Sequence, residues 1–167
     1  MHTPELDSID WKILAQLQED ARISNVELAD KVNLSPSPCL ARVRALENNG
    51  YINRYVALLR PEAVGLGVNV FTQVRLEKQN EPSLKIFEKA ITARPEVMEC
   101  YLMTGTSDYL LRVVVSDLVE FQNFVMALSK IPGIGSIQSS IALKQVKYQT
   151  ALPLPAGNFK PMRGSRH

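Results

Sequence analysis

The chain has 167 residues, of which 46% are hydrophobic and 22% are charged, and its formal net charge is +2. This balance is that of a globular protein with one or two domains. The net charge is too small to indicate a nucleic-acid partner by itself, so such a function must be argued from where the charges lie. The histidines are His2 and His167, and Cys39 and Cys100 lack metal-ligand spacing, which disfavours zinc sites and histidine-dependent catalysis.

Neither end of the chain indicates a membrane or an export route. No run of about 18 apolar residues occurs, so no transmembrane helix is predicted. Residues 1–11 lack the basic and then apolar pattern of a secretion signal. We therefore expect a cytoplasmic location, where both cysteines stay reduced.

Two helices are predicted in the first 32 residues. Apolar residues recur every four positions over 7–20, which predicts a helix capped by Asp7. Ser24 and Glu27 have the spacing of a capping box, in which each side chain bonds the backbone amide of the other residue. That spacing predicts a second, shorter helix that ends near Val32.

A third helix is predicted over 35–50, with Ser35 as its N-cap and Pro36 at its first position. Its inward face should carry Cys39, Leu40, Val43 and Leu46. Its outward face is small at the N-terminal end and carries arginines, whereas exposed helix faces usually mix glutamate and lysine. Small residues permit close approach to another surface, and arginine suits phosphate or guanine.

Charge is strongly divided within the first 60 residues. Residues 36–60 carry four arginines against one glutamate, a net charge of +3, whereas residues 1–35 carry seven acidic against three basic side chains, a net charge of −4. A basic front and an acidic back would orient this region toward a polyanion.

These features predict a helix-turn-helix over about 25–44, whose second helix enters the DNA major groove. For two arginines alone, a solvated helix face is the ordinary explanation; the capped preceding helix, the small face and the local charge favour DNA. We expect Ser35, Ser37 and the helix N-terminus to hold a phosphate. Pro38, Ala41 and Arg42 should approach base edges. Arg44 and Arg54 should contact phosphates.

The second half predicts strands and helices in the order β-α-β-β-α-β, after a hinge at 61–67. This order is the ferredoxin-like pattern, so the fold class is α+β. A sheet covered by helices on one face only would leave apolar groups bare, which predicts a homodimer. The expected elements are strands at 68–77, 97–103, 109–115 and 134–148, the last with a bulge near Lys144, and helices at 82–93 and 116–132.

Three stretches, LDSIDWKIL, LSPSPCLARVRALENNGYI and MECYLMTGTSDYLLRVVVSD, resemble the Lrp/AsnC family over residues 6–154. The resemblance implies a winged helix-turn-helix domain (1–60) and a ferredoxin-like effector and dimerisation domain (68–150). The hinge between them (61–67) and a flexible tail (151–167), polar and rich in proline and glycine, are predicted from the sequence itself. The resemblance implies a sequence-specific transcription regulator of amino-acid metabolism or transport genes. It also implies assembly into dimers and then tetramers or octamers, and no enzymatic cofactor.

The resemblance further implies an amino-acid effector, bound between subunits near a turn at 104–109. Gly105 permits close backbone approach, the hydroxyls of Thr104 and Thr106 suit a carboxylate, and Asp108 suits an ammonium group, with Tyr109 beside them. The same residues also form a good hairpin turn with no ligand, and the two interpretations stand about even.

Two other functions remain open from the sequence. An enzyme built on the ferredoxin-like half is disfavoured, because no internal histidine exists and the carboxylates are scattered. An architectural protein that organises DNA with little effector response is the alternative to a regulator.

Overall fold

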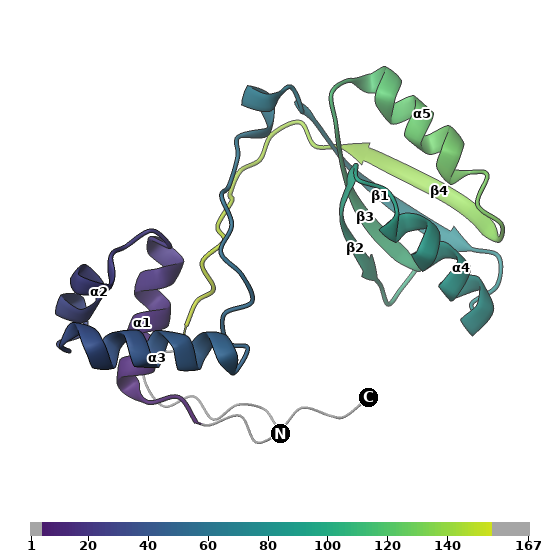
Figure 1. The fold of residues 1–167 in the computed structure, drawn as a ribbon. Helices are drawn as coiled ribbons and strands as arrows, with labels where there is room; N and C mark the ends of the chain where they lie inside the picture. Colours follow the sequence, from purple (N-terminus) through teal and green to yellow (C-terminus); the bar gives the residue numbers. More distant parts are fainter. Residues whose placement is uncertain (1–4, 155–167) are drawn as a thin grey trace. The chain divides into compact units, whose positions relative to one another are not determined.

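The computed structural model describes residues 5–154, which divide into two compact units (Figure 1). One unit comprises the residues up to Ala57 together with those from Lys147, and the other runs from Leu58 to Val146. None of the helices in the described part of the chain combines the length and apolarity that crossing a membrane requires. The predicted domain limits, 1–60 and 68–150, stay predictions beside this division.

The first unit contains the three predicted helices: α1 (Ser8–Glu19), α2 (Asn25–Lys31) and α3 (Pro36–Asn48). The capping boxes explain where the first two begin. Asp7 accepts backbone hydrogen bonds at the start of α1, and Ser24 exchanges hydrogen bonds with the N3 residue of α2. The three helices, and the capping hydrogen bonds of α1 and α2, were therefore predictable from local sequence, whereas the Ser35 side chain makes no capping hydrogen bond on α3.

The apolar core of this unit is formed by Ile13, Leu28, Ala29, Val32, Cys39 and Leu46. Cys39 is fully buried, which confirms the prediction that it is a packed hydrophobe. The prediction that Leu40 lies in the core is wrong, because its side chain is 38% exposed. With Cys39 pointing inward, the next residue is turned by about 100° toward the edge of the buried face.

The second unit has the predicted ferredoxin-like architecture. Its four strands form one antiparallel sheet in the order β2-β3-β1-β4, with the first and third strands in the centre. A short 3-10 turn, Pro61–Val64, precedes the sheet. The elements are β1 (Val68–Leu76), α4 (Glu81–Thr92), β2 (Val97–Leu102), β3 (Tyr109–Val115), α5 (Leu118–Leu128) and β4 (Ile134–Ile141).

Both helices of this unit cover the same face of the sheet. Val74 of β1 and Leu111 of β3 join Phe87 of α4 and Phe124 of α5 in one buried cluster. The opposite side of the sheet, called the open face below, carries Phe71, which is 39% exposed. Pairing places Phe71 beside Arg112 and Gln73 beside Leu110, so the open face mixes apolar with polar side chains.

The predicted strand at 134–148 was too long, and the predicted bulge near Lys144 is wrong. β4 ends at Ile141, which pairs with Val70, and one further backbone bond joins Ala142 to Asn69. Beyond that point β1 offers almost no further partner, so the strand cannot continue. The register shift lies instead between Arg75 and Leu76, opposite the start of β4.

The predicted flexible tail, 151–167, extends past the described residues, and its part from 155 onward lies outside them. Within the described part, the Leu152 backbone bonds the side chain of Gln18 on α1. Leu152 N donates to Gln18 Oε1 at 2.7 Å, and Gln18 Nε2 donates to Leu152 O at 3.3 Å. This end of the chain is therefore attached to the helical unit at Leu152.

Candidate functional site

The N-terminal end of α3 is exposed and small. Ser35 precedes the helix with extended backbone angles, and its side chain makes no capping hydrogen bond. Ser35, Ser37, Pro38 and Ala41 are all exposed. The positive end of the helix dipole lies here, together with backbone amides that have no partner within the helix. This end of α3 thus has the features of an anion-binding helix terminus.

The position of α3 is set partly by α2. Asn25 Nδ2 donates a 2.8 Å hydrogen bond to the carbonyl oxygen of Pro36, at the first turn of α3. Asn33, between the two helices, has a positive φ of 57°, a conformation that asparagine tolerates better than most residues. The tight turn at Asn33 and the hydrogen bond from the Asn25 side chain together fix the start of α3 against α2.

Two of the predicted phosphate contacts, Arg44 and Arg54, have exposed side chains. Neither takes part in a salt bridge within residues 5–154. Arg54 follows α3 in a segment, 51–60, to which no strand is assigned. Nearby, Tyr55 donates a 2.9 Å hydrogen bond to Glu47, and burial together with this carboxylate raises the pKa of Tyr55 to about 12. Both arginines are thus available to an anionic partner.

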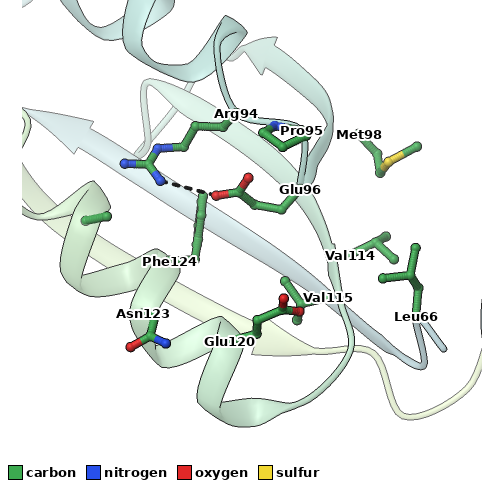
Figure 2. Close-up of a pocket in the computed structure, with 11 residues that line it drawn as sticks. Leu66, Arg94, Pro95, Glu96, Met98, Val114, Val115, Glu120, Asn123 and Phe124 are labelled. Carbon is green, nitrogen blue, oxygen red and sulfur yellow. Dashed lines mark hydrogen bonds and ion pairs between the residues drawn. The ribbon is translucent and has the colours of Figure 1, made fainter.

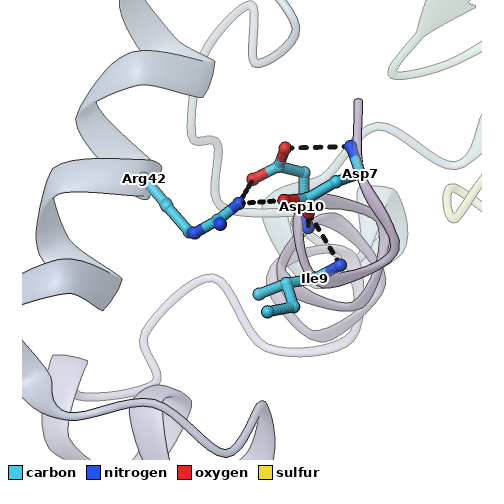
Figure 3. A network of polar contacts seen from close by, with 4 residues as sticks. All are labelled: Asp7, Ile9, Asp10 and Arg42. Atoms are coloured by element: carbon cyan, nitrogen blue, oxygen red, sulfur yellow. Dashed lines mark hydrogen bonds and ion pairs between the residues drawn. The ribbon is translucent and has the colours of Figure 1, made fainter. Parts of the chain in front are cut away.

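The side chain of Arg42, predicted to contact a base edge, meets two carboxylates of α1, and the base contact itself stays a prediction. Its Nη1 atom donates to Asp7 Oδ2 at 2.7 Å and to Asp10 Oδ1 at 2.8 Å (Figure 3). The side chain of Arg42 is 33% exposed, and that of Asp10 is 17% exposed. The hydrogen bonds to Asp10 and Asp7 raise the pKa of Arg42, so its charge is committed to α1.

The predicted effector turn is exposed at its tip and buried at its end. Thr104, Gly105 and Thr106 are exposed, and Gly105 has φ +115°, a conformation that side chains rarely permit. Met103 N donates to the carbonyl oxygen of Asp108 at 2.8 Å, which closes the turn between β2 and β3. The tip therefore presents backbone amides and two hydroxyls to solvent.

Asp108, predicted to bind an ammonium group, is buried within its own chain, and the ligand contact stays a prediction. It is 5% exposed. Its Oδ2 accepts the backbone N–H of Leu76 at 2.6 Å, and its Oδ1 accepts the side-chain amide of Gln79. Because both oxygens are occupied, Asp108 serves to hold the turn against the end of β1.

Tyr109, also predicted to contact the effector, is a core residue with 1% exposure. Its ring packs on Phe87 with centroids 4.4 Å apart, and its hydroxyl donates to Glu88 Oε1 at 2.8 Å. Burial and the neighbouring carboxylate raise the pKa of Tyr109, so the phenol stays protonated. Its ring also lines a cavity of about 260 Å³ beside Cys100.

A different cavity, of about 580 Å³, lies between α5 and the start of β2, and no sequence pattern predicted it (Figure 2). Arg94 and Glu96 form a 3.2 Å ion pair at its wall, and the Arg94 guanidinium lies 5.7 Å from the ring centre of Phe124. None of the predicted effector residues lines this cavity. Within residues 5–154, no cluster of three or more histidine, cysteine or carboxylate side chains is arranged to hold a metal ion.

Comparison with known proteins identifies both units. The family model described as the Lrp/AsnC ligand binding domain matches residues 69–152. The model described as winged helix-turn-helix DNA-binding matches residues 6–53. Together these matches cover α1 to α3 and all of the sheet except Val68, which agrees with the predicted α+β fold.

Characterised relatives extend over nearly the whole chain. The Bkd operon transcriptional regulator of Pseudomonas aeruginosa is 48% identical over 151 residues, which span 90% of this chain and 99% of that protein. The leucine-responsive regulatory protein of Rhizobium meliloti is 42% identical over 144 residues, which span 86% of this chain and 92% of that protein. Since these relatives are regulators, the enzyme hypothesis is set aside.

Similar proteins among the solved structures are also transcription regulators. A transcriptional regulator from Neisseria meningitidis, solved as a complex with L-Met, superposes with a TM-score of 0.85 and is 42% identical, covering 89% of this chain and 97% of that one. An AsnC family transcriptional regulator from Agrobacterium tumefaciens superposes with a TM-score of 0.84 and is 41% identical, with the same coverage. The chain belongs to the Lrp/AsnC family of DNA-binding transcription regulators.

Proposed function

We propose that this chain binds specific DNA sites and regulates genes of amino-acid metabolism or transport. In this proposal an amino-acid-like effector, bound between subunits of the sheet unit, modulates DNA binding. The observation that carries the DNA-binding part is the exposed, small N-terminal end of α3, with two arginines unengaged by carboxylates nearby. The relatives named as regulators support the same class of function.

In the proposed complex, the end of α3 enters the major groove. Ser35, Ser37 and the helix N-terminus hold a phosphate, because their hydroxyls and amides face outward. Pro38 and Ala41 approach the base edges, where small side chains allow close contact and a methyl group can meet a thymine methyl. Arg44 and Arg54 contact phosphates; Arg42 is left out of this set, since two carboxylates already hold it.

The proposed effector site uses the tip of the turn between β2 and β3. Exposed backbone amides and the hydroxyls of Thr104 and Thr106 bind the carboxylate of the effector, and Gly105 keeps the backbone open. Asp108 and Tyr109 support the turn from below and do not touch the ligand. In this proposal the acidic group for the ammonium end comes from a neighbouring copy, in keeping with a site between subunits. The L-Met complex of the Neisseria relative supports an amino acid as the ligand class.

We further propose that a second copy covers the open face of the sheet, giving a dimer that assembles further into a tetramer or octamer. Phe71 on this face and Tyr101 on β2 are 39% and 52% exposed in the single chain. Two-fold symmetry places two copies of α3 at half-sites about one helical turn of DNA apart, roughly 34 to 36 Å, or a multiple of that spacing. The expected DNA site is therefore an imperfect palindrome.

Footprinting tests the proposal on the DNA upstream of the gene that encodes this chain, with and without each amino acid. The expected result is protection of repeated half-sites that one or a few amino acids alter, while the same amino acids raise the melting temperature of the protein. Protection of a single unrepeated half-site would contradict the symmetric arrangement. Sequence-independent protection that no amino acid changes would favour the alternative, an architectural DNA-organising protein.

A variant pair locates the effector part of the proposal. Thr106→Ala removes one of the two proposed carboxylate-binding hydroxyls, and it should abolish or weaken the thermal shift without affecting DNA binding in the absence of effector. Thr92→Ala is the matched control, because the Thr92 hydroxyl bonds a backbone carbonyl of its own helix at 2.7 Å. An unchanged thermal shift in Thr106→Ala would remove this hydroxyl from the site.

A further inference from the structure

We infer that Arg42 is a positioning residue, which fixes the DNA-facing helix α3 to the first turn of α1 through Asp7 and Asp10 and does not itself contact DNA. This inference rests on the proposed function. It assigns Arg42 a role different from the one that its place on a helical wheel suggests.

The capping box of α1 leaves one oxygen of each carboxylate for Arg42. Asp7 Oδ1 accepts the backbone N–H groups of Ile9 at 2.8 Å and Asp10 at 2.9 Å, while Asp10 Oδ2 accepts the Asp7 N–H at 3.1 Å. The remaining oxygens, Asp7 Oδ2 and Asp10 Oδ1, are the two that meet Arg42 Nη1 (Figure 3). The guanidinium thus completes the box without displacing any of its bonds.

The combined charge of this cluster argues against DNA contact. One guanidinium faces two carboxylates, so the three side chains together carry a net negative charge. Such a cluster repels phosphate, and freeing Arg42 for a guanine would leave two neighbouring carboxylates without a counter-charge. Hydrogen bonds between ionised groups at these distances are among the stronger polar contacts in proteins. The geometry therefore favours retention of the ion pairs when DNA binds.

The ion pairs add a polar attachment to the apolar contacts that already hold α3. Asn25 fixes its first turn through the Pro36 carbonyl, and Cys39 and Leu46 anchor its buried side. Arg42 adds a lateral attachment to α1, which sets the rotation of the helix about its own axis. A recognition surface held in one orientation loses less conformational entropy on binding than one that must be ordered.

Salt-dependent binding by the full-length chain separates positioning from contact. The probe is a DNA duplex selected by the wild-type chain from a random library, and affinity is measured by fluorescence anisotropy between about 50 mM and 200 mM NaCl. The variants are Arg42→Gln, Asp10→Asn and the double variant. Arg44→Gln is the matched control, because Arg44 lies exposed on the same helix, two residues further on.

If Arg42 is a positioning residue, Arg42→Gln should weaken DNA binding by about 10-fold and leave the salt slope, the dependence of log affinity on log salt concentration, unchanged. Arg44→Gln should lower the magnitude of that slope by about 1. Asp10→Asn should weaken binding in the same direction, and the double variant should be no weaker than Arg42→Gln alone. The inference is overturned if Arg42→Gln lowers the salt slope as Arg44→Gln does. It is also overturned if Asp10→Asn strengthens binding, which is the result expected when a DNA-contacting arginine is released.

Two further measurements keep the result decisive. If Arg42→Gln does not fold, Arg42→Lys takes its place, because lysine retains one ion pair; intermediate affinity with an unchanged slope is expected, and a lowered slope overturns the inference. If the wild-type chain selects no duplex, the proposed function fails by itself. The coupling between Arg42 and Asp10 is then measured by urea unfolding of the single and double variants. If the losses in the free energy of unfolding are additive, the inference is overturned.

Discussion

The hydroxyl of Tyr109 donates a 2.8 Å hydrogen bond to Glu88 Oε1, and the ring to which it belongs is 1% exposed. The bond joins β3 to α4 beside the contact between the Tyr109 and Phe87 rings. Tyr109→Phe removes the bond and keeps the ring, and Glu88 is exposed enough to be hydrated in its place. We expect a loss of about 1 kcal/mol in the free energy of unfolding, measured with urea.

Tyr101→Phe is the control for this prediction. Tyr101 also donates to a carboxylate, Glu99 Oε2 at 2.9 Å, but its side chain is 52% exposed. Its removal should change the free energy of unfolding by less than about 0.5 kcal/mol. Equal losses in the two variants would show that burial of the Tyr109 hydroxyl adds nothing to the free energy of unfolding.

Asp108→Asn should destabilise the chain strongly. One oxygen of Asp108 accepts the Leu76 N–H and the other accepts the Gln79 amide, so an asparagine side chain must turn its NH2 group toward one of two donors. The mismatch lies in a buried site, and we expect a loss of about 2 to 3 kcal/mol in the free energy of unfolding by urea. Ser107→Ala, next to it in the turn, should cost less than about 1 kcal/mol. If Asp108→Asn instead abolished effector binding at full stability, Asp108 would be a ligand contact after all.

Gly105→Ala tests the backbone of the effector turn. No atom lies within 4 Å of an added Cβ at Gly105, so the cost arises from its φ of +115° alone. We expect a loss of about 1 to 3 kcal/mol in the free energy of unfolding, or a local rearrangement of the turn seen as altered effector binding.

Gly67→Ala provides the comparison, because Gly67 also has open space around it and its φ lies outside the positive region. Alanine there should leave stability unchanged or raise it by about 0.4 to 1 kcal/mol, since it restricts the unfolded chain. Equal effects at the two positions would mean that the positive φ of Gly105 carries no strain.

The capping box of α1 predicts a pH dependence. Burial would raise the pKa of Asp7, but backbone hydrogen bonds and Arg42 outweigh it and hold the pKa below the ordinary value of 3.8. A lowered folded-state pKa contributes stability above the unfolded value, and that stability is lost as the pH falls through the folded value. Below about pH 4, the wild-type chain should therefore lose stability more steeply than Asp7→Asn, in which asparagine still caps the helix.

The measurement is the urea midpoint at a series of acidic pH values, and Asp30→Asn is the control, because Asp30 is exposed on α2. The control should follow the wild-type curve. Parallel curves for Asp7→Asn and the wild type would show that the hydrogen bonds of Asp7 do not lower its pKa in the folded chain.

Local signals in the sequence were sufficient for the helices and for the order of strands. Ser24 and Glu27 lie three residues apart and cap each other, and the alternation along β1 gives its buried face directly. These elements depend on neighbours in sequence, whose relation is fixed by helix or strand geometry. The end of β4 was not predictable in this way, because it depends on where its partner strand runs out.

Partners far apart in sequence explain why the contacts of two candidate site residues were not predicted. A helical wheel places Arg42 on the outer side of α3, but the carboxylates that hold it lie more than thirty residues earlier. Asp108 was assigned by its charge and by its place in a turn, whereas the amide groups that occupy it lie on and after β1. In both cases the sequence identified a charged residue correctly and could not identify the group that neutralises or satisfies it.

The attachment of Leu152 to Gln18 has a consequence for how this protein can be divided. A polypeptide that stopped at residue 60 would contain α1 to α3 and lack a backbone partner that normally arrives 134 residues after Gln18. The helical unit is thus discontinuous in sequence, because the segment that contains the sheet unit, Leu58–Val146, separates its two parts. An excised N-terminal fragment would be an incomplete copy of this unit, and a separately supplied C-terminal peptide containing Leu152 is the piece that would complete it.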